Sequence, residues 1–202
     1  MKAKKTDPMK RFLKQYPFLA ESERIHRLVG EAVGTPEPIR LPERAVTKTL
    51  TEKLPILQQE TYRNRMVRAV YMMQEEVFAR IAEAEVPPLM QESAREYLAV
   101  LKKLRKAAKE EFIIAVLTQD KEAFAALCEQ HVLNEGFLRS TIWRMIAALV
   151  PAELKDPDGW NPDRDKPRFR ENYCPVCGRR PVIADLRKYR EGRTRDLVCG
   201  GC

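Results

Sequence analysis

Residues 173–202 read YCPVCGRRPVIADLRKYREGRTRDLVCGGC, and this stretch decides the fold of the C-terminal part of the chain. It contains two Cys-x-x-Cys pairs, Cys174/Cys177 and Cys199/Cys202, separated by 21 residues. Each pair can form a tight turn that directs two thiolates at one ion, and two such turns complete a tetrahedral four-sulfur site suited to Zn²⁺ or iron. The sequence therefore predicts one Fe or Zn ion bound by Cys174, Cys177, Cys199 and Cys202.

The segment between the two pairs has the composition of a short β-hairpin. Residues 182–184 and 197–198 supply apolar strand residues, and Glu191-Gly192 is expected to reverse the chain between them. Gly178 follows the first pair, at a position where such a turn often needs a positive φ. A module of about thirty residues buries too little surface to fold alone, so the ion is expected to supply much of its stability.

The chain ahead of this module has the composition of helices. Only 8 of the 202 residues are glycine, and long stretches are rich in Ala, Leu, Glu, Lys, Arg and Met. We therefore expect a mainly α protein with a small C-terminal metal module of the rubredoxin-like or zinc-ribbon kind. Its expected parts are a basic leader at 1–7, a multi-helix bundle domain at 8–150, a linker at 151–172 and the metal module at 173–202.

Apolar residues at helical spacing, together with prolines and capping residues, predict the individual helices. The expected helices are a short and a longer one divided by Pro17, a short one at 43–54, a long central one from Pro55 to about Ala84, a helix or bent pair at 89–118, one capped by Asp120 and running through Val132, and one capped by Asn134 and ending at Pro151.

The net charge of +8 is concentrated at the two ends of the chain. Residues 1–14 hold six Lys/Arg against one Asp, residues 161–202 hold eleven against six acidic groups, and residues 15–160 are nearly neutral. In the metal module these cations can contact a polyanion or an acidic protein partner, or simply keep a small hairpin solvated. The candidate contacts are Arg179, Arg180, Arg187, Lys188, Arg190, Arg193 and Arg195.

Four of the five cysteines belong to the metal pattern, which suits a reducing compartment. No apolar segment follows the basic N-terminus and no run is long enough to span a membrane, so a cytoplasmic protein is expected. Cys128 and His131 are three residues apart, and we interpret them as a buried thiol and an ordinary helix-end histidine. Since G-x-S-x-G, H-E-x-x-H and phosphate-loop motifs are absent from the sequence, we do not expect an enzyme.

The pattern C-P-V-C-G-x-x-P-V followed by G-x-x-x-x-L-x-C-x-x-C resembles the formate dehydrogenase accessory proteins of the FdhE type. The helical domain, including Leu54-Pro55-Ile56-Leu57, is also similar. Members of that family continue with a second pair of Cys-x-x-Cys motifs, whereas this sequence ends at Cys202, so the metal module is expected to be incomplete. The matching residues are Cys174 to Gly178, Pro181, Val182, Gly192, Leu197, Cys199 and Cys202.

The resemblance implies a cytoplasmic maturation factor, a chaperone without turnover of its own. Such a factor binds the catalytic subunit of a molybdenum- or tungsten-containing formate dehydrogenase before assembly or export. The resemblance also implies a rubredoxin-like site, for which iron is as good a candidate as zinc. The sequence leaves open which formate dehydrogenase is the client and whether the chain forms a homodimer.

Two alternative functions follow from the residues themselves. The two basic ends favour a nucleic-acid-binding zinc-ribbon protein, in which the N-terminal tail and the ribbon contact phosphates. The Cys-x-x-Cys pairs would serve a dithiol oxidoreductase if they were free of metal and one thiol had a depressed pKa. Two pairs in Pro/Gly turns favour metal binding over this redox role.

Overall fold

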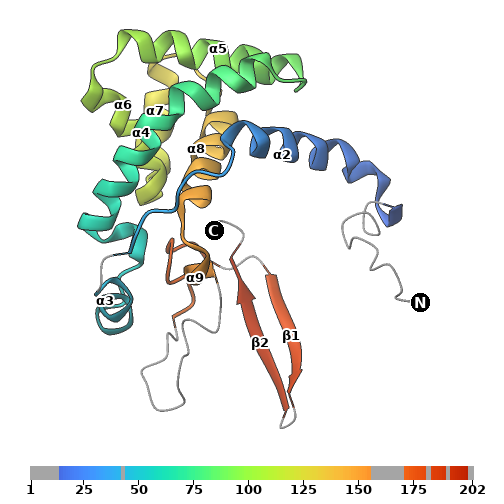
Figure 1. Ribbon diagram of the computed structural model, residues 1–202, viewed down its shortest axis with the longest axis vertical. Coiled ribbons are helices and arrows are strands. Elements are labelled where there is room, and N and C mark those ends of the chain that lie inside the picture. The colour runs from blue at the N-terminus through green and yellow to red at the C-terminus, as the bar shows by residue number, and fades with distance from the viewer. Residues whose placement is uncertain (1–13, 42–43, 156–170, 181–182, 190–191, 200–202) are drawn as a thin grey trace.

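A computed structural model describes residues 14–41, 44–155, 171–180, 183–189 and 192–199, with only the backbone described for the hairpin strands. Helices gather in one part of the molecule and a two-stranded hairpin lies at the opposite end (Figure 1). The elements are η1 (Pro17–Leu19), α2 (Ala20–Val33), α3 (Ala45–Glu52), η2 (Ile56–Gln58), α4 (Glu60–Glu83), α5 (Pro88–Lys103), α6 (Lys106–Thr118), α7 (Lys121–Gln130), α8 (Glu135–Leu149), α9 (Ala152–Lys155), β1 (Ile183–Tyr189) and β2 (Gly192–Val198), where η marks a 3₁₀ helix. The described part of the chain is therefore mainly helical, as predicted.

Capping residues fix the starts of the last two long helices. The Asp120 carboxylate accepts a hydrogen bond from the Ala123 N–H at 2.9 Å, and the Asn134 side chain accepts one from the Phe137 N–H at 3.0 Å. Each bond satisfies an N–H group that has no partner within the first turn of the helix. Both predicted caps are confirmed.

Several boundaries differ from the expected ones for local reasons. Of the two alternatives expected at 89–118, one helix or a bent pair, the structure shows a pair, because the backbones of Leu104 and Arg105 are extended. The helix after Asp120 ends at Gln130, and Val132 has a positive φ of 53°. The expected linker begins with the short helix α9.

The long central helix does not begin directly after Pro55. The 3₁₀ turn η2 comes first, and α4 begins at Glu60. The reason is tertiary, because the backbone N–H groups of Ile56 and Leu57 donate to carbonyls of residues 175 and 176. If α4 began at this point, the N–H groups of Ile56 and Leu57 would point along the helix axis instead of toward those carbonyls.

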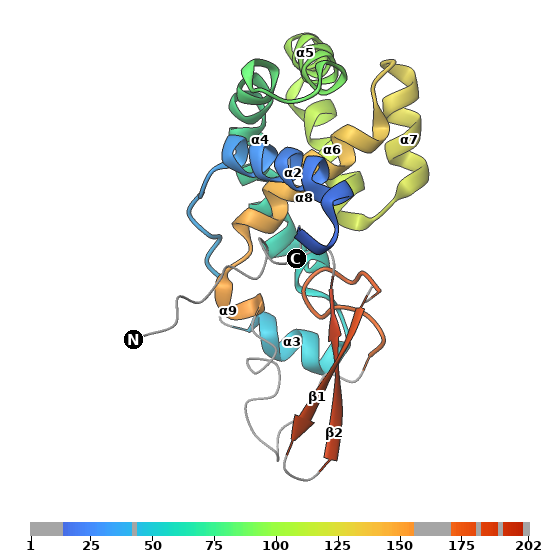
Figure 2. The ribbon, with the colours of Figure 1, turned by 90° about the vertical axis from the view of Figure 1, so that its right-hand side faces the viewer.

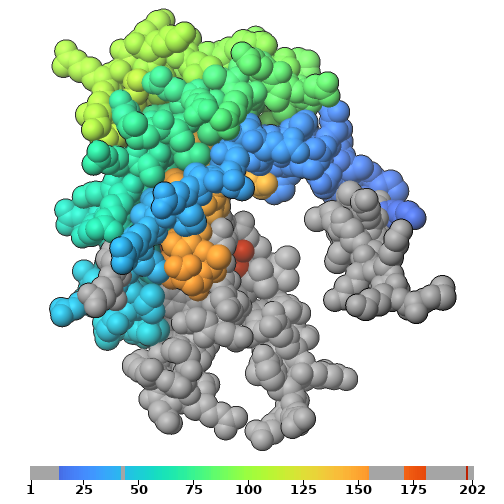
Figure 3. Space-filling model, in the orientation of Figure 1, coloured from blue at the N-terminus to red at the C-terminus, as the bar shows by residue number. Residues whose placement is uncertain are grey.

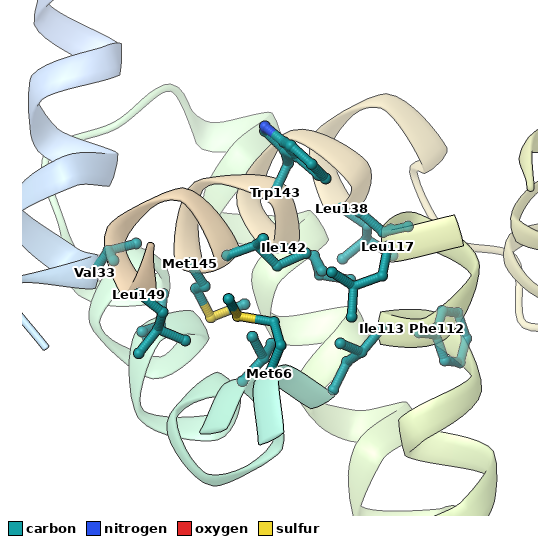
Figure 4. Packing of buried hydrophobic residues seen from close by; sticks show 14 of the residues in the cluster. Val33, Met66, Phe112, Ile113, Leu117, Leu138, Ile142, Trp143, Met145 and Leu149 are labelled. Carbon is teal, nitrogen blue, oxygen red and sulfur yellow. The ribbon is translucent and has the colours of Figure 1, made fainter. Parts of the chain in front are cut away.

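Helix α4 is the centre of the bundle, as expected, with α2, α5, α6 and α8 packed against it. Met66 of α4 meets Met145 of α8 within the core, beside Ile113 and Leu117 of α6 (Figure 4). All four of these side chains are fully buried. Figure 2 shows α2 lying against α8 on another side of the bundle, in agreement with the contacts between these helices.

The chain after α2 passes over the α4–α8 side of the bundle (Figure 3). Its backbone is attached there, because the Ile39 N–H donates to the Leu149 carbonyl at 2.9 Å. The Tyr62 ring of α4 is fully buried, and burial raises the pKa of its hydroxyl well above the usual range. The extended segment therefore helps to close the core around α4.

Aromatic rings connect α4 to its neighbours. They stack edge-to-face in a series, with centroid distances of 5.9 Å for Phe137–Phe78, 4.6 Å for Phe78–Tyr97, 5.6 Å for Tyr97–Phe112 and 6.1 Å for Phe112–Phe124. Edge-to-face pairs at such distances add stability beyond the area they bury. This series joins α4, α5, α6, α7 and α8 into one core.

The hairpin strands pair antiparallel, with Ile183 opposite Val198 and Tyr189 opposite Gly192. Gly192 of the expected reversal is paired within β2, and Glu191 lies outside the described residues. This pairing places the start of β1 beside the end of β2, and these are the strand ends that lie nearest in sequence to the two cysteine pairs. Among the residues described, no helix combines the length and apolar character that crossing a membrane requires.

Candidate metal centre

Three of the four predicted ligands come together in the structure. The sulfur atoms of Cys174, Cys177 and Cys199 all lie within 4.8 Å of one another, and those of Cys177 and Cys199 are 3.4 Å apart. A tetrahedral site with Zn–S bonds of about 2.3 Å requires sulfur–sulfur separations of roughly 3.8 Å, whereas a disulfide requires about 2.05 Å. The arrangement therefore fits a shared metal ion and does not fit a disulfide. Cys202 lies outside the described residues.

Residues 173–180, which we term the knuckle, form the tight turn that carries Cys174 and Cys177. The Gly178 N–H donates to the Cys174 carbonyl and the Cys174 N–H donates to the Arg179 carbonyl, both at 2.8 Å. Gly178 has a φ of 77°, as its place in the sequence predicted. These features direct both thiols to the same side of the turn, where Cys199 meets them.

The knuckle is bound to the helical domain through its backbone. The Ile56 N–H donates to the Pro175 carbonyl at 3.0 Å, and the Leu57 N–H donates to the Val176 carbonyl at 2.9 Å. Val176 is 2% exposed and belongs to the same buried cluster as the helices. The first half of the metal module is thus continuous with the core of the bundle.

The cysteines themselves are enclosed by this docking. The Gln119 side-chain amide at the end of α6 donates to the Cys177 carbonyl at 2.7 Å. Cys174 and Cys177 are buried, and Cys199 is half-buried against the same cluster. A metal held here would be shielded from solvent on the side of the bundle, and its thiolates would be oriented by fixed backbone.

Two side chains of the knuckle also contact the helical domain. The Tyr173 hydroxyl donates to the Lys53 carbonyl at 2.5 Å, and its pKa is raised by burial and by the Glu171 carboxylate. The Arg179 guanidinium lies 3.7 Å from the ring centre of Trp143, a cation–π contact. Trp143 extends from α8 on the side away from Met66 (Figure 4) and is nevertheless only 7% exposed.

The structure describes two of the seven basic residues predicted as partner contacts. Arg179 packs on Trp143, and Arg180 is exposed beside it. The side chains of the other five lie outside the described residues, so their predicted roles stay predictions. They are Arg187, Lys188, Arg190, Arg193 and Arg195.

Cys128 lies in the helical core and His131 is a half-buried residue at the end of α7, in keeping with their interpretation from sequence. Cys128 is 2% exposed, and burial together with Glu135 raises the pKa of its thiol to about 11. The His131 ring is 6.1 Å from the ring centre of Phe112. A thiol with a raised pKa stays protonated at neutral pH and is a poor metal ligand.

Sequence reasoning missed the residues that receive the knuckle, namely Gln119, Trp143 and the η2 backbone. The segment Leu54-Pro55-Ile56-Leu57 entered as the expected start of the central helix and through the family resemblance, but not as the part that contains the two donors to the knuckle. Gln119 has a positive φ of 60° at the end of α6, but this conformation is not evident from its residue type. The contacts of Gln119 and of the η2 backbone with the knuckle join residues far apart in the chain, so no motif or periodic spacing in the sequence indicates them.

Comparisons with known proteins add no relative. No protein-family model, curated protein or solved structure matches this chain. The resemblance to formate dehydrogenase accessory proteins therefore rests on the residues quoted for it above.

Replacing Gly178 by alanine is expected to lower the free energy of unfolding by about 2 kcal/mol. An L-residue at this φ is strained by roughly 1–2 kcal/mol, and its Cβ would approach the Gln58 side-chain amide nitrogen to 2.8 Å and the Pro55 ring to 3.1 Å. Urea unfolding of the metal-loaded protein measures the loss. Gly136→Ala is the control, since its Cβ would meet only the Asn134 side-chain oxygen, at 3.8 Å, and it should not destabilise. A Gly178→Ala protein as stable as the native one would contradict the docked knuckle.

Proposed function

We propose that this protein is an accessory factor that binds the catalytic subunit of a formate dehydrogenase and assists its assembly, without catalysis of its own. The observation that carries the proposal is the gathering of Cys174, Cys177 and Cys199 on the helical domain, in the sequence pattern on which the family resemblance rests. In this proposal Cys202 completes a rubredoxin-like site of four cysteines for one Fe or Zn ion. The protein acts in the cytoplasm.

The bound metal would hold the two halves of the C-terminal module together. Cys174 and Cys177 belong to the knuckle, which is bound to η2 and α6, whereas Cys199 follows β2. One ion bridging them fixes the end of the hairpin to the bundle. A closed four-sulfur site leaves no coordination position for substrate, so its proposed role is to maintain a binding surface or to sense redox state.

The raised pKa values of a thiol and a phenol in the bundle support a structural role for the residues of its interior. The pKa of Tyr97 is raised well above the usual range by burial and then by Cys128, and its hydroxyl donates to the Gln74 side chain at 3.0 Å. Cys128 has a raised pKa for the same chief reason. Raised values at fully enclosed positions keep these groups neutral and fixed in the core. Client binding would then use the outer surface of the bundle and the metal module.

Affinity recovery from cells that make a formate dehydrogenase tests the proposal. A tagged full-length chain, purified without oxygen, is expected to recover the catalytic subunit, and Cys174→Ser is expected to recover less because the knuckle loses its metal. An unrelated tagged helical protein is the control for nonspecific capture. Failure of the native chain to recover any formate dehydrogenase subunit would overturn the proposed function.

A nucleic-acid-binding role is the second candidate, and the basic ends of the sequence favour it. It predicts binding of a single-stranded oligonucleotide with a steep negative dependence on salt, because phosphate contacts release condensed counterions. Weak binding that is insensitive to salt would exclude this candidate. The two candidates are separable, since only the first requires a protein client.

A further inference from the structure

A cavity of about 360 Å³ lies beside the candidate metal centre, between the α6–α7 turn, α8 and the knuckle. We term it the basic cavity, because four cationic side chains line it against one carboxylate, that of Asp120. Its size lies within the range of cavities that bind small ligands or single side chains. The four cations are Lys121, Arg139, Arg179 and Arg180.

Two of these cations are already held in place by the protein. Arg139 pairs with Glu135 and lies 5.3 Å from the Phe124 ring centre, and Arg179 lies on Trp143. These contacts restrict both guanidinium groups before any ligand arrives. Prior restriction lowers the entropy that binding would otherwise cost.

The positive charge of the basic cavity is not fully neutralised. Lys121 and Arg180 are exposed and form no ion pair with any described residue. The Asp120 carboxylate is engaged in capping α7 through its bond from Ala123. Among the described residues that line the cavity or pair with its cations, the carboxylates are those of Asp120 and Glu135, so the four cations leave an excess of positive charge there.

A second cavity of about 360 Å³ adjoins the first along the groove between α6 and α7. The two cavities share Ala115 and Asp120, and the second has apolar walls that include Ile114, Ala123 and Leu127. Ile114 is 40% exposed, so its side chain is accessible in this groove. Moving from one cavity to the other, the surface changes from cationic to partly apolar, with the Glu111 carboxylate among the lining residues of the second cavity.

We propose that the basic cavity and the adjoining apolar groove bind an acidic, partly apolar peptide segment of the client protein. This inference rests on the proposed function, because it requires a protein client. Guanidinium groups bind carboxylates through paired hydrogen bonds, and an aliphatic side chain in the groove would bury apolar surface. The N-terminal tail of this chain cannot be the occupant on grounds of charge, since residues 1–14 hold six cations against one Asp.

Metal binding and peptide binding are linked in this arrangement. Arg179 and Arg180 directly follow the knuckle turn that presents Cys174 and Cys177 to the metal. Gln119, which lines the basic cavity, donates to the Cys177 carbonyl. Loss of the metal would remove one attachment of the knuckle and leave it to its contacts with η2, Gln119, Lys53 and Trp143, so that two of the four cations would be less firmly positioned. The metal-loaded protein therefore binds the acidic segment more tightly than the metal-free protein.

Fluorescence anisotropy with a labelled peptide of alternating glutamate and leucine tests the inference on the metal-loaded full chain. The matched probe replaces each glutamate by glutamine and is expected to bind at least about tenfold more weakly. Arg180→Glu and Lys121→Glu are each expected to weaken binding of the acidic peptide by about tenfold, and a chelator should do the same. Arg68→Glu makes the same charge change at an exposed α4 position outside both cavities, and it should have little effect.

Several results would overturn the inference. These are equal binding of the two peptides, equal effects of Arg180→Glu and Arg68→Glu, and preferential binding of inorganic phosphate or of a single-stranded oligonucleotide through the same residues. Affinity recovery separates this inference from the proposed function. If native protein and Arg180→Glu recover the formate dehydrogenase subunit equally, the cavity is not the client site. If the acidic peptide binds but no subunit is recovered, the proposed function fails instead.

Discussion

Replacing Cys177 by serine is expected to remove most of the metal-dependent stability of the protein, a loss of about 4 kcal/mol when metal is present at roughly a thousand times its dissociation constant. Cys177 is fully buried, and its sulfur lies 3.4 Å from that of Cys199. A serine hydroxyl is a poor ligand at this site, because a metal of this type prefers thiolate. Without the ion, the knuckle would depend on its bonds to η2 and Gln119 and on the contacts of Tyr173 and Arg179 with the bundle.

Urea unfolding with and without a chelator, under anaerobic conditions, measures this effect. The native protein should lose stability when chelator is added, whereas Cys177→Ser should be unstable from the start and insensitive to chelator. Cys128→Ala is the matched control, because Cys128 is also buried but lies apart from the cysteine cluster. Its sensitivity to chelator should equal that of the native protein. A Cys177→Ser variant that retains native sensitivity would contradict the site.

Replacing Phe112 by alanine is expected to lower the free energy of unfolding by about 3–5 kcal/mol. Phe112 is fully buried and packs edge-to-face with both Tyr97 and Phe124. Truncation removes a large apolar side chain and leaves a cavity where α5, α6 and α7 meet. Because well-packed cores relax only in part, the empty volume adds to the lost transfer free energy.

Phe18→Ala is the control for the Phe112 experiment. Phe18 is 76% exposed, so its truncation should change stability by no more than about 0.5 kcal/mol. Both variants can be compared by the midpoint of urea unfolding, with the slope of the transition checked for change. A loss below about 1 kcal/mol for Phe112→Ala would mean that the aromatic series is not part of a packed core.

The bundle was predictable from the sequence where local chemistry determines the structure. Asp120 and Asn134 provide capping oxygens that act within their own turn, so the residue type alone is informative. The apolar stripe of α4 is similarly local, and it correctly indicated the central helix. The next helix was expected from residue 89, and α5 begins one residue earlier with Pro88 in its first turn, where proline is favoured.

The elements that sequence did not predict depend on distant partners. The turn η2 exists where Ile56 and Leu57 donate to carbonyls of residues 175 and 176, far along the chain. Backbone groups are the same in every residue, so such a contact leaves no trace in side-chain periodicity. The extended conformation at Leu104 and Arg105 is likewise not specified by their side chains, which suit a helix interior.

The ligands of the metal centre could be predicted from the sequence, but the contacts between the metal centre and the helical bundle could not. Cys-x-x-Cys spacing is sufficient to predict that two thiols share a turn, and the structure brings Cys199 to the first pair. The burial of the cysteines against the bundle, and the contact of Arg179 with Trp143, required the tertiary structure. These contacts form the basis for linking the metal to the neighbouring basic cavity.

Metal content of protein purified without oxygen, measured together with its absorbance spectrum, tests the central claim most directly. We predict about one equivalent of Fe or Zn per chain in the native protein, since one site of four cysteines binds one ion, and loss of that ion in Cys174→Ser. Cys128→Ala should retain the native content. Native protein without metal, or a metal content unchanged by Cys174→Ser, would contradict the metal centre and the functions proposed from it.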